Sequence, residues 1–133
     1  MVNQAKPVFV NDAEFISATH EADSWLANAI VTLSRQPDLL RTGYHHESMS
    51  ILGAAVDGLQ LLSQFAQSAG KINGLDPLNQ AEFVQFGPSI LAIITELVSA
   101  MESEDSVLLA DVIEYELLPV LEHFHQITKN LLA

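Results

Sequence analysis

Glu122 and His125 are the residues whose types and spacing come closest to a metal-binding pattern. Side chains three positions apart lie on one face of an α-helix, so both can reach one ion. His20 falls at a similar level if the first and last helices are antiparallel neighbours, and Glu21 and His123 are further candidates. Imidazole and carboxylate ligands suit zinc or nickel. One interpretation of the chain is therefore a metal site formed by His20, Glu122 and His125.

A simpler interpretation of these residues needs no metal. None of them lies on the main apolar stripe of its helix, which favours solvated positions. His123 and His125 near a helix C-terminus also interact favourably with the helix dipole when protonated. A di-iron centre would need two Glu-x-x-His pairs, and the chain has one. We therefore expect no resident metal and keep the His20, Glu122 and His125 site as the alternative.

Catalytic signatures are missing from the sequence. It has no G-x-x-x-x-G-K-[ST], G-x-G-x-x-G, G-x-S-x-G or H-E-x-x-H pattern. It also has no cysteine, which excludes disulfides, thiolate metal ligands and thiol nucleophiles. These absences favour a non-enzymatic protein with no cofactor.

The charge balance is strongly acidic. The 133 residues include 5 Lys+Arg and 17 Asp+Glu, for a net charge of −12. Phosphate backbones and anionic lipid surfaces are bound by clustered basic residues, so we expect neither nucleic acid nor membrane as a partner. The longest apolar run, Ile90 to Ile94, is far shorter than the roughly 20 residues of a membrane span. We expect a soluble, cytoplasmic protein with a single domain over residues 1–133.

Apolar residues recur every three or four positions through most of the chain, which indicates helices. The spacing predicts helices over about 12–36, 44–69, 77–102 and 106–131, after an extended lead-in over 1–10. Four such helices joined by short links predict an all-α, up-and-down four-helix bundle.

Local signals support several of these boundaries. Asn11 with Glu14 reads as an N-cap and capping box, and Asp76 followed by Pro77 is a strong helix start. The connection over residues 37–44 has room for one helical turn at 38–41.

Small residues and prolines interrupt the predicted helices. Gly53 and Gly58 each cost about 1 kcal/mol relative to Ala, a loss that a close helix crossing would offset. Trp25 flanks the stripe of its helix and is expected to be half-buried. Pro88 and Pro119 predict kinks, the first in a helix that stays in phase across it, with a break there as the second option.

The last predicted helix carries two apolar lines. The first comprises Leu109, Ile113, Leu117, Val120, Phe124, Ile127 and Leu131. The second comprises Leu108, Val112, Tyr115, Leu118 and Leu121. A helix in a lone bundle needs an apolar arc of about 100°, so we expect another subunit, a partner helix or the Val8–Val10 lead-in to cover the surplus.

The sequence therefore predicts a protein–protein interaction or assembly module, most simply a homodimer, that uses an apolar face of the third and fourth helices. A metal-binding bundle is the alternative. A third interpretation, a pocket for an apolar ligand near Gly87 and Pro88, rests on the predicted kink alone.

Overall fold

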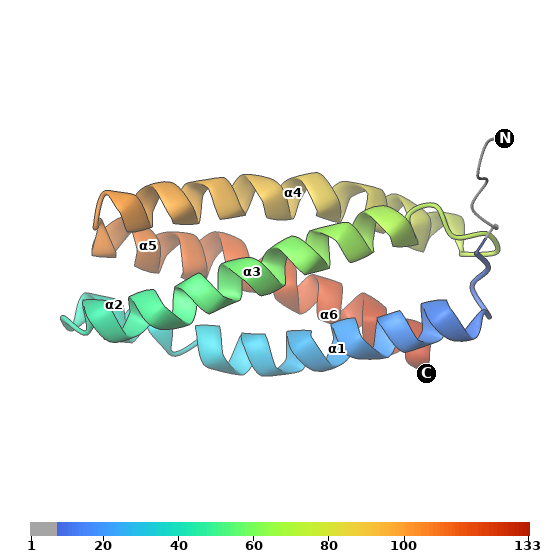
Figure 1. Ribbon diagram of the computed structural model, residues 1–133, viewed down its shortest axis with the longest axis horizontal. Coiled ribbons are helices and arrows are strands. Elements are labelled where there is room, and N and C mark those ends of the chain that lie inside the picture. Colours follow the sequence, from blue (N-terminus) through green and yellow to red (C-terminus); the bar gives the residue numbers. More distant parts are fainter. Residues whose placement is uncertain (1–7) are drawn as a thin grey trace, which may run out of the picture.

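The computed structural model describes residues 8–133, and over these residues it is a bundle of four helical rods (Figure 1). The elements are α1 (Ala13–Leu33), α2 (Gln36–Arg41), α3 (His45–Ala69), α4 (Pro77–Glu102), α5 (Ser106–Val112), the π-helical turn η1 (Ile113–Leu117) and α6 (Leu118–Leu132). The predicted all-α, up-and-down four-helix bundle is confirmed.

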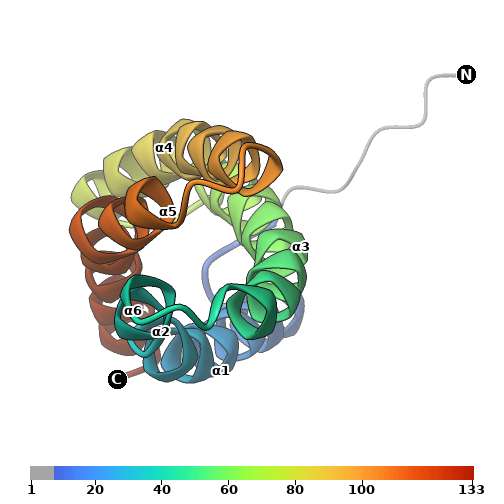
Figure 2. The same cartoon turned by 90° about the vertical axis from the view of Figure 1, so that its left-hand side faces the viewer.

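The rods are arranged as a ring when seen end-on (Figure 2). Helix α3 packs along α4, and α1 packs along α6. The short α2 lies against α5 at one end of the bundle. Helices α1 and α3 touch less extensively than either of the long pairs.

Helix α4 has the bounds that the sequence predicted, because its start is strongly specified. The Asp76 carboxylate accepts hydrogen bonds from the backbone N–H groups of Leu78 and Asn79, at 3.2 and 3.3 Å. The helix continues through Pro88 without a break. The hydroxyl of Ser63 on α3 donates to the Gly87 carbonyl at 3.1 Å, so this segment also fixes the approach of α3 to α4.

The predicted start of the first helix is wrong. Helix α1 begins at Ala13, with Asp12 and not Asn11 at the N-cap position, and no side chain caps it. The Asp12 carboxylate instead accepts from the Phe9 N–H at 2.9 Å, which is why it is not free to bond the helix. The helix also ends at Leu33 and not at residue 36. The helical turn expected at 38–41 is confirmed and extends back to Gln36 as α2.

The lead-in pairs with the loop between α3 and α4. Phe9 forms a parallel bridge with Asn73, whose carbonyl accepts from the Val10 N–H and whose N–H donates to the Val8 carbonyl, both at 2.9 Å. The loop holds the backbone of these residues, and the Val8 and Val10 side chains pack against the core. Residues 1–7 of the predicted lead-in lie outside the described residues.

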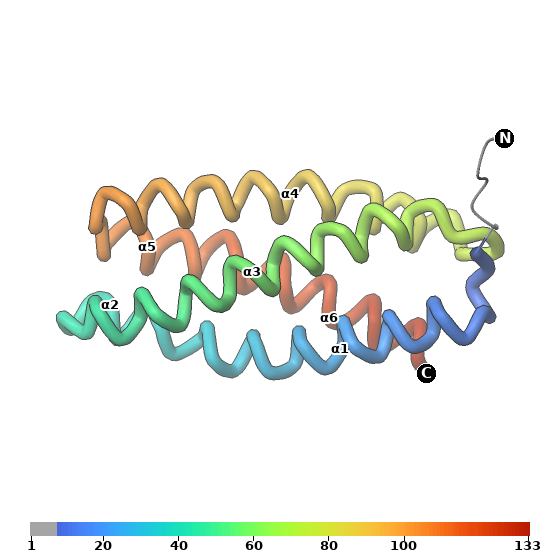
Figure 3. The backbone as a smooth tube through the Cα atoms, in the orientation of Figure 1, coloured from blue at the N-terminus to red at the C-terminus, as the bar shows by residue number. Residues whose placement is uncertain are grey.

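The fourth rod contains a π-helical turn immediately before Pro119. The Leu118 N–H donates to the carbonyl of Ile113, five residues back. Pro119 has no N–H to offer to the preceding turn, so the wider turn is where the chain accommodates it. The rod stays continuous from α5 to α6 (Figure 3).

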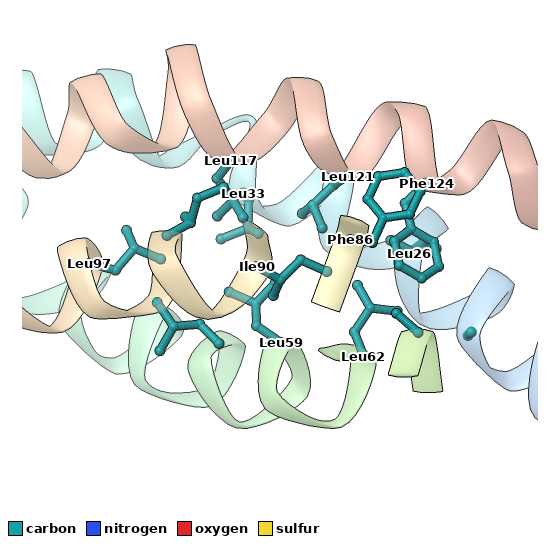
Figure 4. Close-up of a cluster of buried hydrophobic side chains, with 14 of the residues drawn as sticks. Leu26, Leu33, Leu59, Leu62, Phe86, Ile90, Leu97, Leu117, Leu121 and Phe124 are labelled. Atoms are coloured by element: carbon teal, nitrogen blue, oxygen red, sulfur yellow. The ribbon is translucent and has the colours of Figure 1, made fainter. Parts of the chain in front are cut away.

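The core runs the length of the ring. Leucine and isoleucine side chains from all four rods meet along the axis, as Leu26, Leu59, Ile90 and Leu117 illustrate (Figure 4). A cluster of phenylalanines lies toward the α1 N-terminus, comprising Phe15, Phe65, Phe83, Phe86 and Phe124, with ring centroids 4.4 to 6.2 Å apart. These contacts hold Phe65 of α3 in place, although it is only half-buried.

Candidate interaction surfaces

The predicted second apolar line of the last helix does not form one surface. Val112 and Leu121 are fully buried, which contradicts their expected place on an exposed face. Leu118 is half-buried against the core. Leu108 and Tyr115 are exposed, at 45% and 67%. Only two of the five expected contact residues therefore face outward.

Two features of the fold explain the difference. Helix α5, which carries the buried Val112, packs against α4 and against α2, and the sequence suggested α2 only as one turn within a link. The π turn adds one residue to a helical turn, so a residue after it takes the direction that its predecessor would have in an uninterrupted α-helix. After the turn Leu121 is fully buried and Val120 is half-buried, whereas Phe124 and Ile127 keep the buried positions predicted for them.

The structure does not bring His20, Glu122 and His125 together. Within residues 8–133, no three His, Asp or Glu side chains are grouped so that they could hold a metal ion. His20 and Glu122 are exposed. The His125 ring instead lies 3.2 Å from the Asp23 carboxylate, which also accepts from the Thr128 hydroxyl at 2.8 Å.

His123 lies on the other side of α6 and contacts α4. Its ring nitrogen is 3.0 Å from the Glu82 carboxylate, and its ring centroid is 5.5 Å from that of Phe86. The two histidines of α6 thus face two different helices, since residues two apart are separated by about 200° around a helix. Each joins α6 to a neighbouring rod.

Arg41 ties α2 to the fourth rod. Its guanidinium lies 2.7 Å from the Glu114 carboxylate and 3.0 Å from that of Asp111. A hydrogen bond from Tyr115, followed by the one from Arg41, lowers the pKa of the Glu114 carboxyl below its ordinary value. The same carboxylate raises the pKa of the Tyr115 phenol. This exposed cluster is a structural clamp at one end of the bundle.

The outer face of α4 carries an uncharged stripe that we call the α4 seam. It consists of Ala81, Val84, Pro88, Leu91, Thr95 and Val98, at alternating steps of three and four residues. Val84 is 59% exposed and Leu91 43%, whereas Val98 at the end of the stripe is half-buried against the core. The Thr95 hydroxyl donates to the Leu91 carbonyl at 3.0 Å, so its donor is already satisfied. Such spacing is that of a coiled-coil contact face.

Carboxylates occur beside the α4 seam and not on it. No charged residue lies between Glu82 and Glu96, although the chain carries a net charge of −12. The neighbouring Glu96 carboxyl raises the pKa of the Glu116 carboxyl in the π turn. Helix α4 is long and apolar enough to cross a membrane, judged by length and composition alone. In the bundle, 44% of its most apolar stretch of 18 residues is buried.

A groove opens where α1 and α3 have less contact. We call it the α1–α3 groove; its volume is about 380 Å³. It is lined by Ala18, Glu21, Ala22, Trp25, Gly58, Leu61, Leu62 and Phe65. The groove lies away from Gly87 and Pro88, the position at which the kink suggests a pocket.

Gly58 is what allows the Trp25 ring to lie against α3. A Cβ atom built on Gly58 would stand 2.6 Å from the indole nitrogen and closer still to a ring carbon, far inside van der Waals contact. Gly53, by contrast, has nothing within 4 Å of such an atom. The close crossing predicted from the glycines therefore occurs at Gly58, where the contact is with a half-buried tryptophan.

Periodicity predicted part of the α4 seam, since Leu91, Ile93 and Val98 were surplus apolar residues of the third predicted helix; Leu91 and Val98 lie on the seam, but Ile93 is buried. The sequence also contained a second signal for this surface. The stretch from Phe83 to Thr95 has no charge, whereas a solvent-facing helical surface in an acidic protein normally carries carboxylates. The α1–α3 groove had no comparable signal, because it depends on how far apart two helices lie.

These features define a small helical-bundle protein with outward apolar surfaces. The chain belongs to the family described as Domain of unknown function (DUF8042), which matches residues 17–127. Neither a curated protein nor a solved structure matches it.

Proposed function

We propose that this protein is a non-enzymatic, cytoplasmic assembly module that forms a homodimer through the α4 seam. The observation that carries the proposal is the absence of charge on an exposed, regularly spaced apolar stripe in a chain of net charge −12. Two such chains repel each other when their charged surfaces come within the Debye length, about 8 Å at physiological salt. The α4 seam is the surface where that repulsion is weakest.

The order of residues along the α4 seam favours a second copy as the partner. The seam alternates small residues (Ala81, Pro88, Thr95) with larger ones (Val84, Leu91, Val98). In an antiparallel pair centred between Pro88 and Leu91, each larger side chain faces a small one of the other copy. A two-fold interface requires such self-complementarity, and alternating sizes allow it to pack without voids.

The size of the surface predicts a weak dimer. A helix of 26 residues is about 39 Å long and about 10 Å wide, so two copies of α4 would bury roughly 800 Å² in total. Stable interfaces usually bury about 1,200–2,000 Å². We therefore expect reversible association that depends on concentration.

The charge pattern argues against a lipid surface at the same place. Helix α4 has no Lys or Arg, and the acidic chain would be repelled by anionic headgroups. A protein partner without net negative charge is the principal competitor of the self-association proposal. The metal-binding alternative gains no support from the observed positions of His20, Glu122 and His125.

Sedimentation velocity between about 1 μM and 1 mM tests the proposal, since this range covers free energies of about −8 to −4 kcal/mol. We expect a shift from monomer to dimer in the wild type. Val84→Glu with Leu91→Glu places charge on the seam and should leave a folded monomer throughout. Val31→Glu on α1, at a residue of 54% exposure, is the matched control and should dimerise normally.

Two results would contradict the proposal. One is a wild type that stays monomeric at 1 mM, above all if it then sediments with anionic vesicles. The other is a Val84→Glu, Leu91→Glu protein that still dimerises.

A further inference from the structure

The α1–α3 groove has the size of a small-molecule site. Ligand pockets have volumes of about 300–1,000 Å³, and this groove, at about 380 Å³, lies at the lower end. Its lining residues span Ala18 to Trp25 on α1, which is about 10 Å of helix. That length is too short to seat a partner helix over several turns but is sufficient for a compact organic molecule.

The walls of the groove are apolar, and its base is firmly held. Ala22 and Leu62 are buried at its base, while Leu61 is 66% exposed at its edge. Phe65 is stacked on Phe15 and lies edge-on to Phe83, so it cannot easily turn to fill the space. Because Ala18 and Gly58 are small, the groove stays open between the larger side chains.

One charged side chain, Glu21, lines the groove, one helical turn before Trp25. Neither α1 nor α3 contains a Lys or Arg, and Asp57 adjoins Gly58 on α3. The local field is therefore negative and is not neutralised by either helix. A carboxylate next to an indole ring is a combination that attracts an organic cation, through ion pairing and cation–π attraction.

We propose that the α1–α3 groove binds a small amphiphilic molecule with a single ammonium head. The ammonium group lies beside the Glu21 carboxylate and the Trp25 ring, and the apolar body covers Leu61 and Phe65. This site is separate from the α4 seam, so its occupancy does not depend on dimer formation.

Trp25 provides a direct measurement because it is the only tryptophan in the chain. We would titrate the protein with hexyltrimethylammonium and follow Trp25 fluorescence. A saturable change with half-saturation at about 0.1–10 mM is expected for a ligand of this size on a shallow surface. Hexanoate, which has a similar apolar chain and the opposite charge, should give no saturable change.

Variants of matched charge identify the site. Glu21→Gln should weaken binding about 2- to 5-fold, the range for an exposed ion pair. Glu47→Gln changes the net charge equally but lies in the first turn of α3, outside the groove, and should bind as the wild type does. Ala18→Leu fills the groove and should abolish the fluorescence response.

Three outcomes would overturn the inference. These are no saturable response to the cation, an equal response to hexanoate, and equal affinity of the Glu21→Gln and Glu47→Gln proteins. Val84→Glu with Leu91→Glu should bind the cation normally, which distinguishes failure of this inference from failure of the dimer proposal.

Discussion

Replacing Gly58 by Ala should destabilise the bundle even though the same change elsewhere on α3 should stabilise it. In a helix interior, Gly→Ala is worth about 0.5–1 kcal/mol in favour of folding. At Gly53 a Cβ atom meets nothing within 4 Å, so Gly53→Ala should realise that gain. At Gly58 the new atom would overlap the Trp25 indole, 2.5 Å from one ring carbon and 2.6 Å from the nitrogen.

The overlap sets the size of the effect. Trp25 is a rigid ring that must move by about 1 Å or more, and forcing extra atoms into a packed site costs about 1–3 kcal/mol. The unfolding free energies of Gly58→Ala and Gly53→Ala should therefore differ by about 1–3 kcal/mol, in favour of Gly53→Ala. Urea unfolding followed by circular dichroism measures both, because the helical signal does not depend on Trp25.

A double-mutant cycle separates the collision from other causes. In a Trp25→Ala background the ring is gone, so Gly58→Ala should become neutral or stabilising, like Gly53→Ala. The reasoning is refuted if Gly58→Ala and Gly53→Ala have equal effects in the wild-type background. It is also refuted if removing the indole leaves the penalty unchanged.

Two further predictions concern polar contacts. The Ser48 hydroxyl donates to the buried side-chain oxygen of Gln36 at 2.9 Å, and Ser48→Ala would leave that oxygen without a donor. The variant should therefore lose about 1–3 kcal/mol of unfolding free energy, measured with urea. Ser50→Ala, at an exposed position of the same helix, is the control and should cost little. Arg41→Met should raise the Glu114 pKa toward its ordinary value in an NMR titration, with Arg35→Met as control. The pKa of Glu114 is lower in the folded protein than its ordinary value of 4.5. Arg41 therefore stabilises the fold fully above about pH 4.5, and this stabilisation is lost as the pH falls through the folded-state pKa. Arg41→Met should accordingly lose more stability at pH 7 than at pH 3.

The bundle itself was predictable because its strongest signals are local. Asp76 and Pro77 specify a helix start through two independent effects, a side-chain cap and a preset backbone angle, and the observed bounds of α4 agree with the prediction. Asn11 and Glu14 suggested a similar start but failed, because Asp12 bonds backward to Phe9 and takes the N-cap position.

The surfaces were less predictable because they depend on how the helices pack. The sequence does not show that α2 packs on α5 or that a π turn precedes Pro119. Periodicity assumes an uninterrupted α-helix, so the two apolar lines of the last helix were interpreted as core and surplus. Pro119 predicts a disturbance of the helix, but a bend and a π turn both accommodate a proline, and the sequence does not distinguish them.

The π turn also divides the fourth rod between two sets of neighbours. Before it, α5 packs on α4 and on α2, and α2 is a separate helix of 6 residues, too short to be stable alone. After it, the 15-residue α6 packs on α1 and contributes Phe124 to the phenylalanine cluster. The backbone amides of α2 should therefore open at lower free energy than those of the long rods, and hydrogen exchange should begin in α2, at the Arg41 end, while the phenylalanine end stays closed.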